Sequence, residues 1–283
     1  MKTLRFINTG LFAILLSFTF VACGDDEEEY ERPNDPTTEN PTPVPEPETS
    51  KKLVKIVEKE GEIKEDYIDE GIRTYTFNYD SRGNVISALE YQDEYDNTIC
   101  NNFDYTNDSI ITFNFKLDGD YGEKVTFGLS NNKIIYAKRE GSETGRLIYE
   151  FNYEYNSAGQ LTQYYQSSIG HEYLIWSGNK LIESNGDFWE FEDLIYEYGN
   201  KTCKGYNPIL VFEYCNIFLP IVAKPELLGL KTNELPTSYY EGGDIAKCTY
   251  EFYDDGYLKK CTMSWVDEFG IADEYSEYTF IWE

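Results

Sequence analysis

The chain has 283 residues and a formal net charge of −28, with 52 acidic residues against 24 basic ones. Phosphates require a basic face, so this balance excludes nucleic acid and anionic lipid headgroups as expected partners. With a single histidine, the chain also lacks the residues for a multi-histidine metal site.

The first 22 residues have the pattern of a secretory signal peptide. Lys2 and Arg5 precede an apolar run from Leu11 to Ala22, which is too short to span a bilayer. The run leads into Cys23-Gly24, and this junction resembles a bacterial lipobox. We therefore expect residues 1–22 to be removed and Cys23 to carry the acyl chains of a membrane anchor. In the alternative reading, Cys23 is a disulfide partner in an ordinary secreted protein.

Residues 23–50 have the composition of a disordered tether. The acidic run at 25–29 (DDEEE) resembles the surface-export signal of Bacteroidetes lipoproteins, although like charges also suit a solvated spacer. Residues 31–50 hold six of the ten prolines and almost nothing apolar, so they cannot form a core. We expect a lipid-anchored protein of the outer membrane, exposed at the cell surface, with the membrane as its partner through the lipid.

Residues 51–283 form the expected single all-β domain, and its basic unit is a hairpin. Between Thr74 and Tyr91, aromatic residues alternate with polar ones until a turn that ends in Gly83. The pattern returns between Tyr149 and Tyr165 around Gly159, and between Tyr250 and Trp265 around Gly256. Together with further alternating runs, it predicts strands at 53–58, 75–79, 85–91, 103–105, 110–117, 124–129, 133–138, 147–155, 161–166, 172–176, 180–183, 188–198, 247–253, 257–265 and 274–282.

Short strands at this spacing predict an antiparallel meander, curled into a barrel-like or strongly bent sheet, with a sandwich as the other possibility. One irregular crossover, at about 206–240, interrupts the meander. It contains four prolines among apolar residues, so it cannot be a central strand throughout. Pro225 suits a helix start, which predicts a short helical turn at Pro225-Glu226-Leu227-Leu228.

The repeated motif Y-x-F-x-Y-D-x-x-G-x-V and the segment LGLKTNELP at 228–236 resemble the DUF4595 family of Bacteroides lipoproteins. Thr232 replaces a serine of the family pattern. The hairpins also resemble RHS-type YD repeats, without their strict period. The DUF4595 resemblance implies a porin-like β fold with no assigned function, and neither likeness supplies catalytic residues.

The cysteines predict one disulfide. Cys248 and Cys261 flank the turn at Gly256 almost symmetrically, so we expect them to pair across the hairpin. Cys203 and Cys215 form a weaker second candidate. No cysteine has the spacing of a metal ligand, and we expect no metal or other cofactor.

The residues for catalysis are sparse. His171 is the single histidine, so a histidine-dependent triad would rest on it alone. A pair of carboxylates acting as a glycoside hydrolase stays possible, because that chemistry needs two acids placed across a sugar. The turns Asp118-Gly119-Asp120 and Asp254-Asp255-Gly256 offer oxygen ligands for calcium, with plain turns as the other reading.

Most of the 26 tyrosines, 17 phenylalanines and 4 tryptophans alternate with charged residues, as the inward face of a sheet should. A tyrosine or tryptophan near solvent can instead stack against a sugar ring. Our expected function is a non-enzymatic module that binds a glycan or another envelope component. The alternatives are a protein-interaction module and, third, an acid-pair hydrolase. The candidate stacking residues are Trp176, Trp189, Tyr164, Tyr165, Tyr239 and Tyr240.

Overall fold

The computed structural model describes residues 50–63, 68–92, 97–107, 109–117, 122–166, 170–186, 193–215, 219–241, 244–266 and 272–283. All described elements belong to the unit Thr49–Glu283. The predictions for the signal peptide, Cys23 and all but the last residue of the tether lie outside the described residues.

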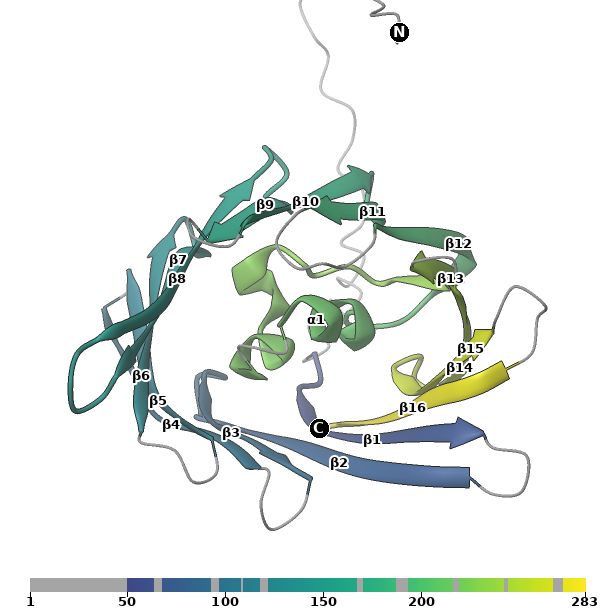
Figure 1. The fold of residues 1–283 in the computed structure, drawn as a ribbon, viewed down its shortest axis with the longest axis horizontal. Helices are drawn as coiled ribbons and strands as arrows, with labels where there is room; N and C mark the ends of the chain where they lie inside the picture. The colour runs from purple at the N-terminus through teal and green to yellow at the C-terminus, as the bar shows by residue number, and fades with distance from the viewer. Residues whose placement is uncertain are drawn as a thin grey trace, which may run out of the picture. The chain divides into compact units, whose positions relative to one another are not determined.

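Sixteen antiparallel strands close into one barrel, in which most strands pair with their neighbours in chain order and the last pairs with the first (Figure 1). The all-β, antiparallel prediction is confirmed, as a barrel rather than a sandwich. The strands are β1 (Leu53–Ile63), β2 (Ile68–Tyr79), β3 (Val85–Tyr91), β4 (Asn97–Asn107), β5 (Ile110–Leu117), β6 (Glu123–Ser130), β7 (Lys133–Gly141), β8 (Leu147–Tyr155), β9 (Leu161–Gln166), β10 (Gly170–Ser177), β11 (Lys180–Gly186), β12 (Leu194–Thr202), β13 (Glu234–Glu241), β14 (Asp244–Phe252), β15 (Leu258–Val266) and β16 (Ala272–Trp282).

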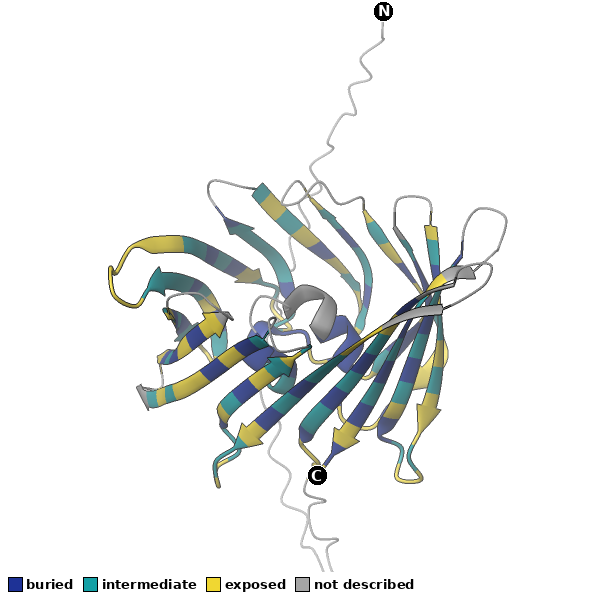
Figure 2. Cartoon of the chain, turned by 60° about the horizontal axis from the view of Figure 1, so that its bottom comes forward, coloured by how far each residue is buried: buried dark blue, intermediate teal, exposed yellow. Residues whose placement is uncertain are grey.

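The period-two alternation separates an apolar inner wall from a polar outer wall. In β5, Ile111, Phe113 and Phe115 are buried, whereas the residues between them are partly or fully exposed. Figure 2 shows the same alternation as stripes of buried and exposed residues along the strands. Side chains from all sides of the barrel therefore converge on one interior core.

The outer wall carries charged and hydroxyl side chains along the middle of its strands. In β14 the outward positions are Lys247, Thr249 and Glu251, all exposed. Between β7 and β8, Lys138 and Glu150 face each other and form an ion pair of 3.3 Å. Exposed isoleucine, leucine and aromatic side chains lie among these polar groups. The outer wall is therefore predominantly hydrophilic.

The three turn glycines lie where the repeated pattern predicts them. Gly83, Gly159 and Gly256 have φ values of 82°, 75° and 86°, a left-handed region that favours glycine. Each joins two neighbouring strands, and each donates its N–H to a carbonyl three residues earlier. The predicted hairpins are confirmed at all three places.

A ring of aromatic side chains, which we call the collar, closes the end of the barrel that holds these turns. Each member stands near the end of an even-numbered strand and donates a hydrogen bond to a carbonyl near the start of the preceding strand. The bonds run from Tyr79 to Leu53, Tyr105 to Val85, Tyr155 to Ile134, Trp176 to Leu161, Tyr198 to Leu181, Tyr250 to Pro236 and Trp282 to Leu258. In β6 the corresponding residue is Leu129.

The described residues of the segment 203–233, which we call the plug, leave the wall after β12 and lie inside the ring of strands (Figure 1). They contain α1 (Pro208–Cys215) and two 3-10 helices, η1 (Leu219–Ala223) and η2 (Pro225–Leu228). The predicted helical turn at 225–228 is confirmed. Among the described residues, no helix is long and apolar enough to cross a membrane.

Two features of the predicted crossover need correction. First, residues 234–241 form β13, so the crossover ends before residue 240. Pro236 is tolerated in this strand because the pairing with Tyr198 is shifted on both sides, where a ladder N–H is not needed. Second, α1 was not predicted; Asn207 begins it, because its Oδ1 accepts the N–H of Ile209 at 3.1 Å.

Side-chain hydrogen bonds to backbone carbonyls hold the plug to the barrel. The hydroxyl of Thr232 donates to the carbonyl of Asn179 at 2.7 Å, and Lys133 Nζ donates to the carbonyl of Glu226 at 2.5 Å. Gly229 lies so close to the β8–β9 turn that an added Cβ would be 2.3 Å from the carbonyl oxygen of Gly159. The plug therefore lies at the collar end of the barrel, and the opposite end, where odd-numbered strands end and even-numbered strands begin, is the rim.

Candidate functional site

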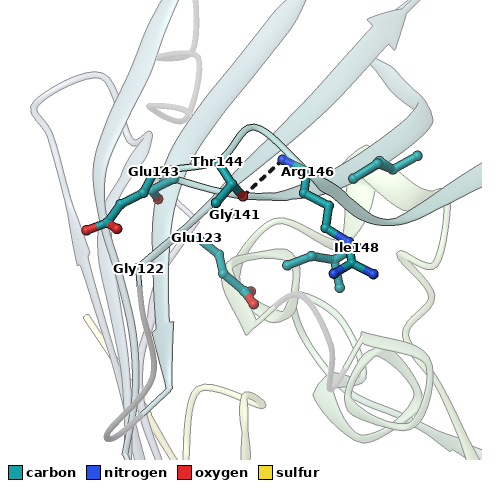
Figure 3. Close-up of a pocket in the computed structure, with 9 residues that line it drawn as sticks. Gly122, Glu123, Gly141, Glu143, Thr144, Arg146 and Ile148 are labelled. Carbon is teal, nitrogen blue, oxygen red and sulfur yellow. Dashed lines mark hydrogen bonds between the residues drawn. The ribbon is translucent and has the colours of Figure 1, made fainter.

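A pocket of about 630 Å³ lies at the rim of the barrel, where β6, β7 and β8 meet (Figure 3). Its volume falls in the range of pockets that take small molecules. Charged, hydroxyl and aliphatic groups alternate around it. We call it the rim pocket, and its lining is Gly122, Glu123, Gly141, Ser142, Glu143, Thr144, Arg146, Leu147 and Ile148.

The β7–β8 turn forms one wall of the rim pocket because of its glycines. Gly145 has φ 62°, and its N–H donates to the carbonyl of Gly141 at 2.8 Å. Gly141 in turn donates to the carbonyl of Arg146 at 3.0 Å, and Ser142 N donates to the carbonyl of Gly122 at 3.0 Å. These hydrogen bonds close the β7–β8 turn and join it to Gly122, which directly precedes β6.

An ion pair on the inner wall borders the rim pocket. Arg139 on β7 binds the carboxylate of Glu123 through Nε and donates from a terminal nitrogen to the hydroxyl of Tyr149 at 2.8 Å. Its guanidinium lies 4.1 Å from the ring centroid of Phe115. Both charged side chains are about six-sevenths buried, at 14% and 16% exposure. Burial raises the pKa of Tyr149, and the nearby Arg139 partly opposes this rise.

This arrangement leaves one pocket cation without a carboxylate within bonding range among the described residues. Figure 3 shows Glu123, Arg146 and Ile148 on the same side of the turn, with Glu143 pointing away from them. Arg139 already neutralises Glu123, whereas Arg146 is exposed. Arg146 therefore has its guanidinium donors directed toward the pocket, where hydroxyl or carbonyl oxygens can accept them.

A second polar cluster lies on the inner wall between β1 and β2. Glu58 is buried and accepts a hydrogen bond of 2.6 Å from the hydroxyl of Tyr75. Burial raises the pKa of Glu58, whereas hydrogen bonds from Tyr75 and Tyr278 and the charge of Arg73 lower it. Arg73 lies 3.8 Å from the carboxylate. Glu58 and Tyr75 are both buried, so this cluster belongs to the core.

The predicted stacking residues are divided between the two walls. Trp176 belongs to the collar and is partly buried, whereas Tyr239 faces inward with 4% exposure and offers no ring face to a ligand in solution. Tyr164 also faces inward, where its ring packs against Tyr153. Tyr165 and Tyr240 face outward. Trp189 lies outside the described residues.

Tyr165 belongs to a row of three nearly parallel rings that the sequence did not reveal. His171 on β10 stands opposite Tyr165, with ring centroids 5.1 Å apart and an interplanar angle of 21°. Tyr173, two residues further along β10, lies 6.1 Å from the His171 ring at 9°. We call Tyr165, His171 and Tyr173 the aromatic row. Only the strand register brings these residues together.

The predicted disulfide between Cys248 and Cys261 needs correction, because both residues are present as thiols. Cys248 stands opposite Met263, and Cys261 stands opposite Tyr250. The two cysteines are therefore diagonal neighbours, about 7–8 Å apart in general, which exceeds the usual span of a disulfide. The wider loop around Gly256 and the irregular pairing at Phe252 shift the register by this step. Cys203 is also a thiol.

The candidate calcium turns offer no metal cluster among the described residues. Asp255 forms an ion pair of 2.6 Å with Lys51, which lowers its pKa together with the N–H of Tyr257. The Asp255 carboxylate is therefore already bound by Lys51 and by the backbone of its own turn. The other candidate, Asp118-Gly119-Asp120, lies outside the described residues.

The fold defines the class of this protein as a closed antiparallel barrel, here with an internal plug, and the comparisons agree with the barrel. No family model matches the chain, and no curated protein matches it either. Among the matching solved structures is the crystal structure of a porin-like protein from Bacteroides uniformis. It has a TM-score of 0.60 and 14% identity, and the alignment covers 82% of this chain and 96% of that one. This likeness supports the expected porin-like fold, and DUF4595 membership stays a resemblance.

Proposed function

We propose that this protein is a lipid-anchored binding module of the outer membrane, held at the cell surface by Cys23. The signal peptide, the lipobox-like junction and the acidic run at 25–29 support the anchor and its outward direction. The hydrophilic outer wall supports a barrel that stands in water on its tether. Charged side chains on a lipid-facing wall would cost about 2–4 kcal/mol each for Lys or Arg at mid-membrane.

The rim pocket is the observation that carries the binding function. Its arginine, its hydroxyl groups and its aliphatic side chains match the mixed polar and apolar surface of a saccharide. The Glu123 carboxylate in the pocket lining is paired with Arg139. Its role is therefore to accept hydrogen bonds from a ligand rather than to act as a general acid or base. The proposed ligand is therefore a glycan or a glycan-bearing envelope component, bound without chemical conversion.

Binding is tested with the lipid-free chain of residues 50–283 on a glycan array, followed by calorimetry with each ligand found. Arg146→Ala should raise the Kd about tenfold or more, because a charge-assisted hydrogen bond contributes about 1.5–3 kcal/mol. Arg82→Ala, in an exposed turn at the collar end, is the matched control and should leave the Kd unchanged. Silence across the whole array, or equal losses in both variants, contradicts a glycan site in the rim pocket.

The anchor is tested separately in cells that carry the full chain. Wild-type protein should be recovered with the outer membrane and should be accessible to protease added outside. Cys23→Ala should move the protein to the soluble fraction. If the Cys23→Ala protein stays with the membrane, another part of the chain holds it there.

One observation favours a second candidate function, docking of another surface protein. Leu89 and Tyr91 on β3, with Ile99 opposite Leu89 on β4, form an apolar outward patch with exposures of 36%, 50% and 37%. Ile72 on β2 adds a fourth exposed side chain nearby. A pull-down from outer membranes that depends on Leu89 and Ile99, from a protein silent on the glycan array, would favour this function.

A further inference from the structure

From the aromatic row on the outer wall, we propose a second saccharide-binding site, separate from the rim pocket and suited to a neutral polysaccharide chain. This inference rests on the proposed function in taking a saccharide as the ligand. It differs in its position, on the outer faces of β9, β10 and β11 instead of the rim. It also differs in the form of the ligand, a chain lying across the outer surface of these strands.

The three rings are held in place by the strands that carry them. Tyr165 and His171 are a cross-strand pair, and Tyr173 follows two residues later on the same face. The amide Nε2 of Gln163 donates to Nδ1 of His171 at 2.7 Å, which fixes the imidazole plane. A ligand therefore meets rings that are already oriented, and it spends little free energy on ordering them.

The rings remain accessible from outside the barrel. His171 is exposed, and Tyr173 is 44% exposed, far above the buried aromatic residues of the inner wall. Because the three rings stack against one another, a pyranose ring meets the outward edges of the row and the outer faces of its end rings, Tyr165 and Tyr173, while its hydroxyl groups need polar partners beside them. The tyrosine hydroxyls supply such partners at two of the three positions.

Amide groups beside the row supply further hydrogen bonds. Asn185 on β11 stands opposite Tyr173, and its Nδ2 donates to the carboxylate of Glu183 at 2.5 Å, which orients the amide. Gln163 stands opposite Tyr173 on the other side. Side chains of this kind, which both donate and accept, fit vicinal hydroxyls.

The charge of this surface selects a neutral ligand. The patch formed by the row, Gln163 and Asn185 contains no lysine or arginine, and the charged groups beside it are Glu183 on β11 and Glu154, which stands opposite Gln163 on β8. The whole chain carries a formal charge of −28. An anionic polysaccharide would meet repulsion without a compensating cation, whereas a neutral chain would not.

The test is native gel electrophoresis of residues 50–283 through gels that contain a β-glucan, an α-glucan, a xylan, a mannan or the acidic polygalacturonate. At least one neutral polymer should retard the protein, and polygalacturonate should not. Tyr173→Ala and His171→Ala should each raise the apparent Kd about three- to tenfold, as expected for the loss of one ring contact. Thermal unfolding by circular dichroism verifies that each variant is folded.

Phe252→Ala on β14 is the matched control, because it removes an aromatic side chain of similar exposure, 38%, from another part of the barrel. Retardation by no neutral polymer, or equal losses in Phe252→Ala and Tyr173→Ala, overturns the inference. Loss in Arg146→Ala with none in Tyr173→Ala also overturns it, while leaving the rim pocket intact. Loss in Tyr173→Ala alone supports the aromatic row and counts against the rim pocket.

Discussion

Glu58 is a carboxylate placed in an apolar wall, and its environment favours the neutral form. Its side chain is 3% exposed, and burial raises its pKa more than the hydroxyls of Tyr75 and Tyr278 and the charge of Arg73 lower it. The hydrogen bond from Tyr75 satisfies one oxygen at 2.6 Å. Ionisation of this group therefore costs folding free energy near neutral pH.

We expect Glu58→Gln to remove this pH-dependent cost. The folded-state pKa lies above the reference value of 4.5, so the contribution of Glu58 to stability is present below that pH. It is lost as the pH rises through the raised folded-state value. Relative to wild type, the variant should therefore gain free energy of unfolding between pH 4.5 and pH 7. The gain is about 1.4 kcal/mol for each unit by which the pKa is raised.

Urea unfolding at the two pH values measures this gain. Glu251→Gln, on the outer wall with 59% side-chain exposure, is the control and should differ from wild type by the same amount at both pH values. A pH-independent difference for Glu58→Gln would show that the carboxylate is not destabilised by burial.

Among the elements, the collar gives each pair of an odd strand and the next even strand, except β5–β6, one hydrogen bond that the strand ladder does not provide. Tyr79→Phe removes the hydroxyl that donates to the carbonyl of Leu53 at 2.6 Å and leaves the ring in place. We expect the free energy of unfolding to fall by about 1 kcal/mol, measured by urea unfolding. Tyr91→Phe removes an exposed outer-wall hydroxyl and should leave stability unchanged. Equal stability of both variants would mean that water replaces the collar bond without cost.

The plug meets the wall most tightly at Gly229, and this contact gives a sharper test. An added Cβ would be 2.3 Å from the carbonyl oxygen of Gly159, at a residue whose φ is already 66°. Gly229→Ala should lower the free energy of unfolding by about 2–4 kcal/mol, from backbone strain together with the clash. Gly145→Ala has a similar φ of 62° with nothing within 4 Å, so it should show strain alone, about 1 kcal/mol. Thermal melts of both variants compare the two costs.

The elements differ in how far the sequence could predict them. Hairpins were predictable because their signals are local: alternating aromatics followed by a glycine such as Gly83. The helix α1 was not, because Ile209, Leu210 and Val211 are all buried, and a segment buried on every side shows no helical period. Of the aromatic row, Tyr165 was predicted as a stacking residue. Its pairing with His171 was not predictable, because it depends on a strand register that no local pattern sets.

At the scale of the whole molecule, closure of the barrel was beyond a local prediction. It depends on the pairing of β1 with β16, which places Leu53 opposite Trp282. Those residues lie at opposite ends of the domain sequence. The inner wall packs apolar side chains against the plug, whereas a membrane-spanning pore places its apolar band outside and its polar groups in the lumen. Compared with such a pore, this barrel therefore has its apolar side chains on the inner wall and its polar side chains on the outer wall.

This reversal leads to a prediction about solubility. Residues 50–283, expressed without Cys23, should remain in solution without detergent and sediment as one species, because Lys138, Glu150 and Lys247 on the outer wall face water. Adding detergent should not change the sedimentation coefficient beyond the density correction. A flotation assay with phospholipid vesicles tests the opposite outcome, in which the barrel binds the bilayer. A barrel that floats without its lipid anchor would bury these charges in the bilayer, and the water-facing assignment of the outer wall would then be wrong.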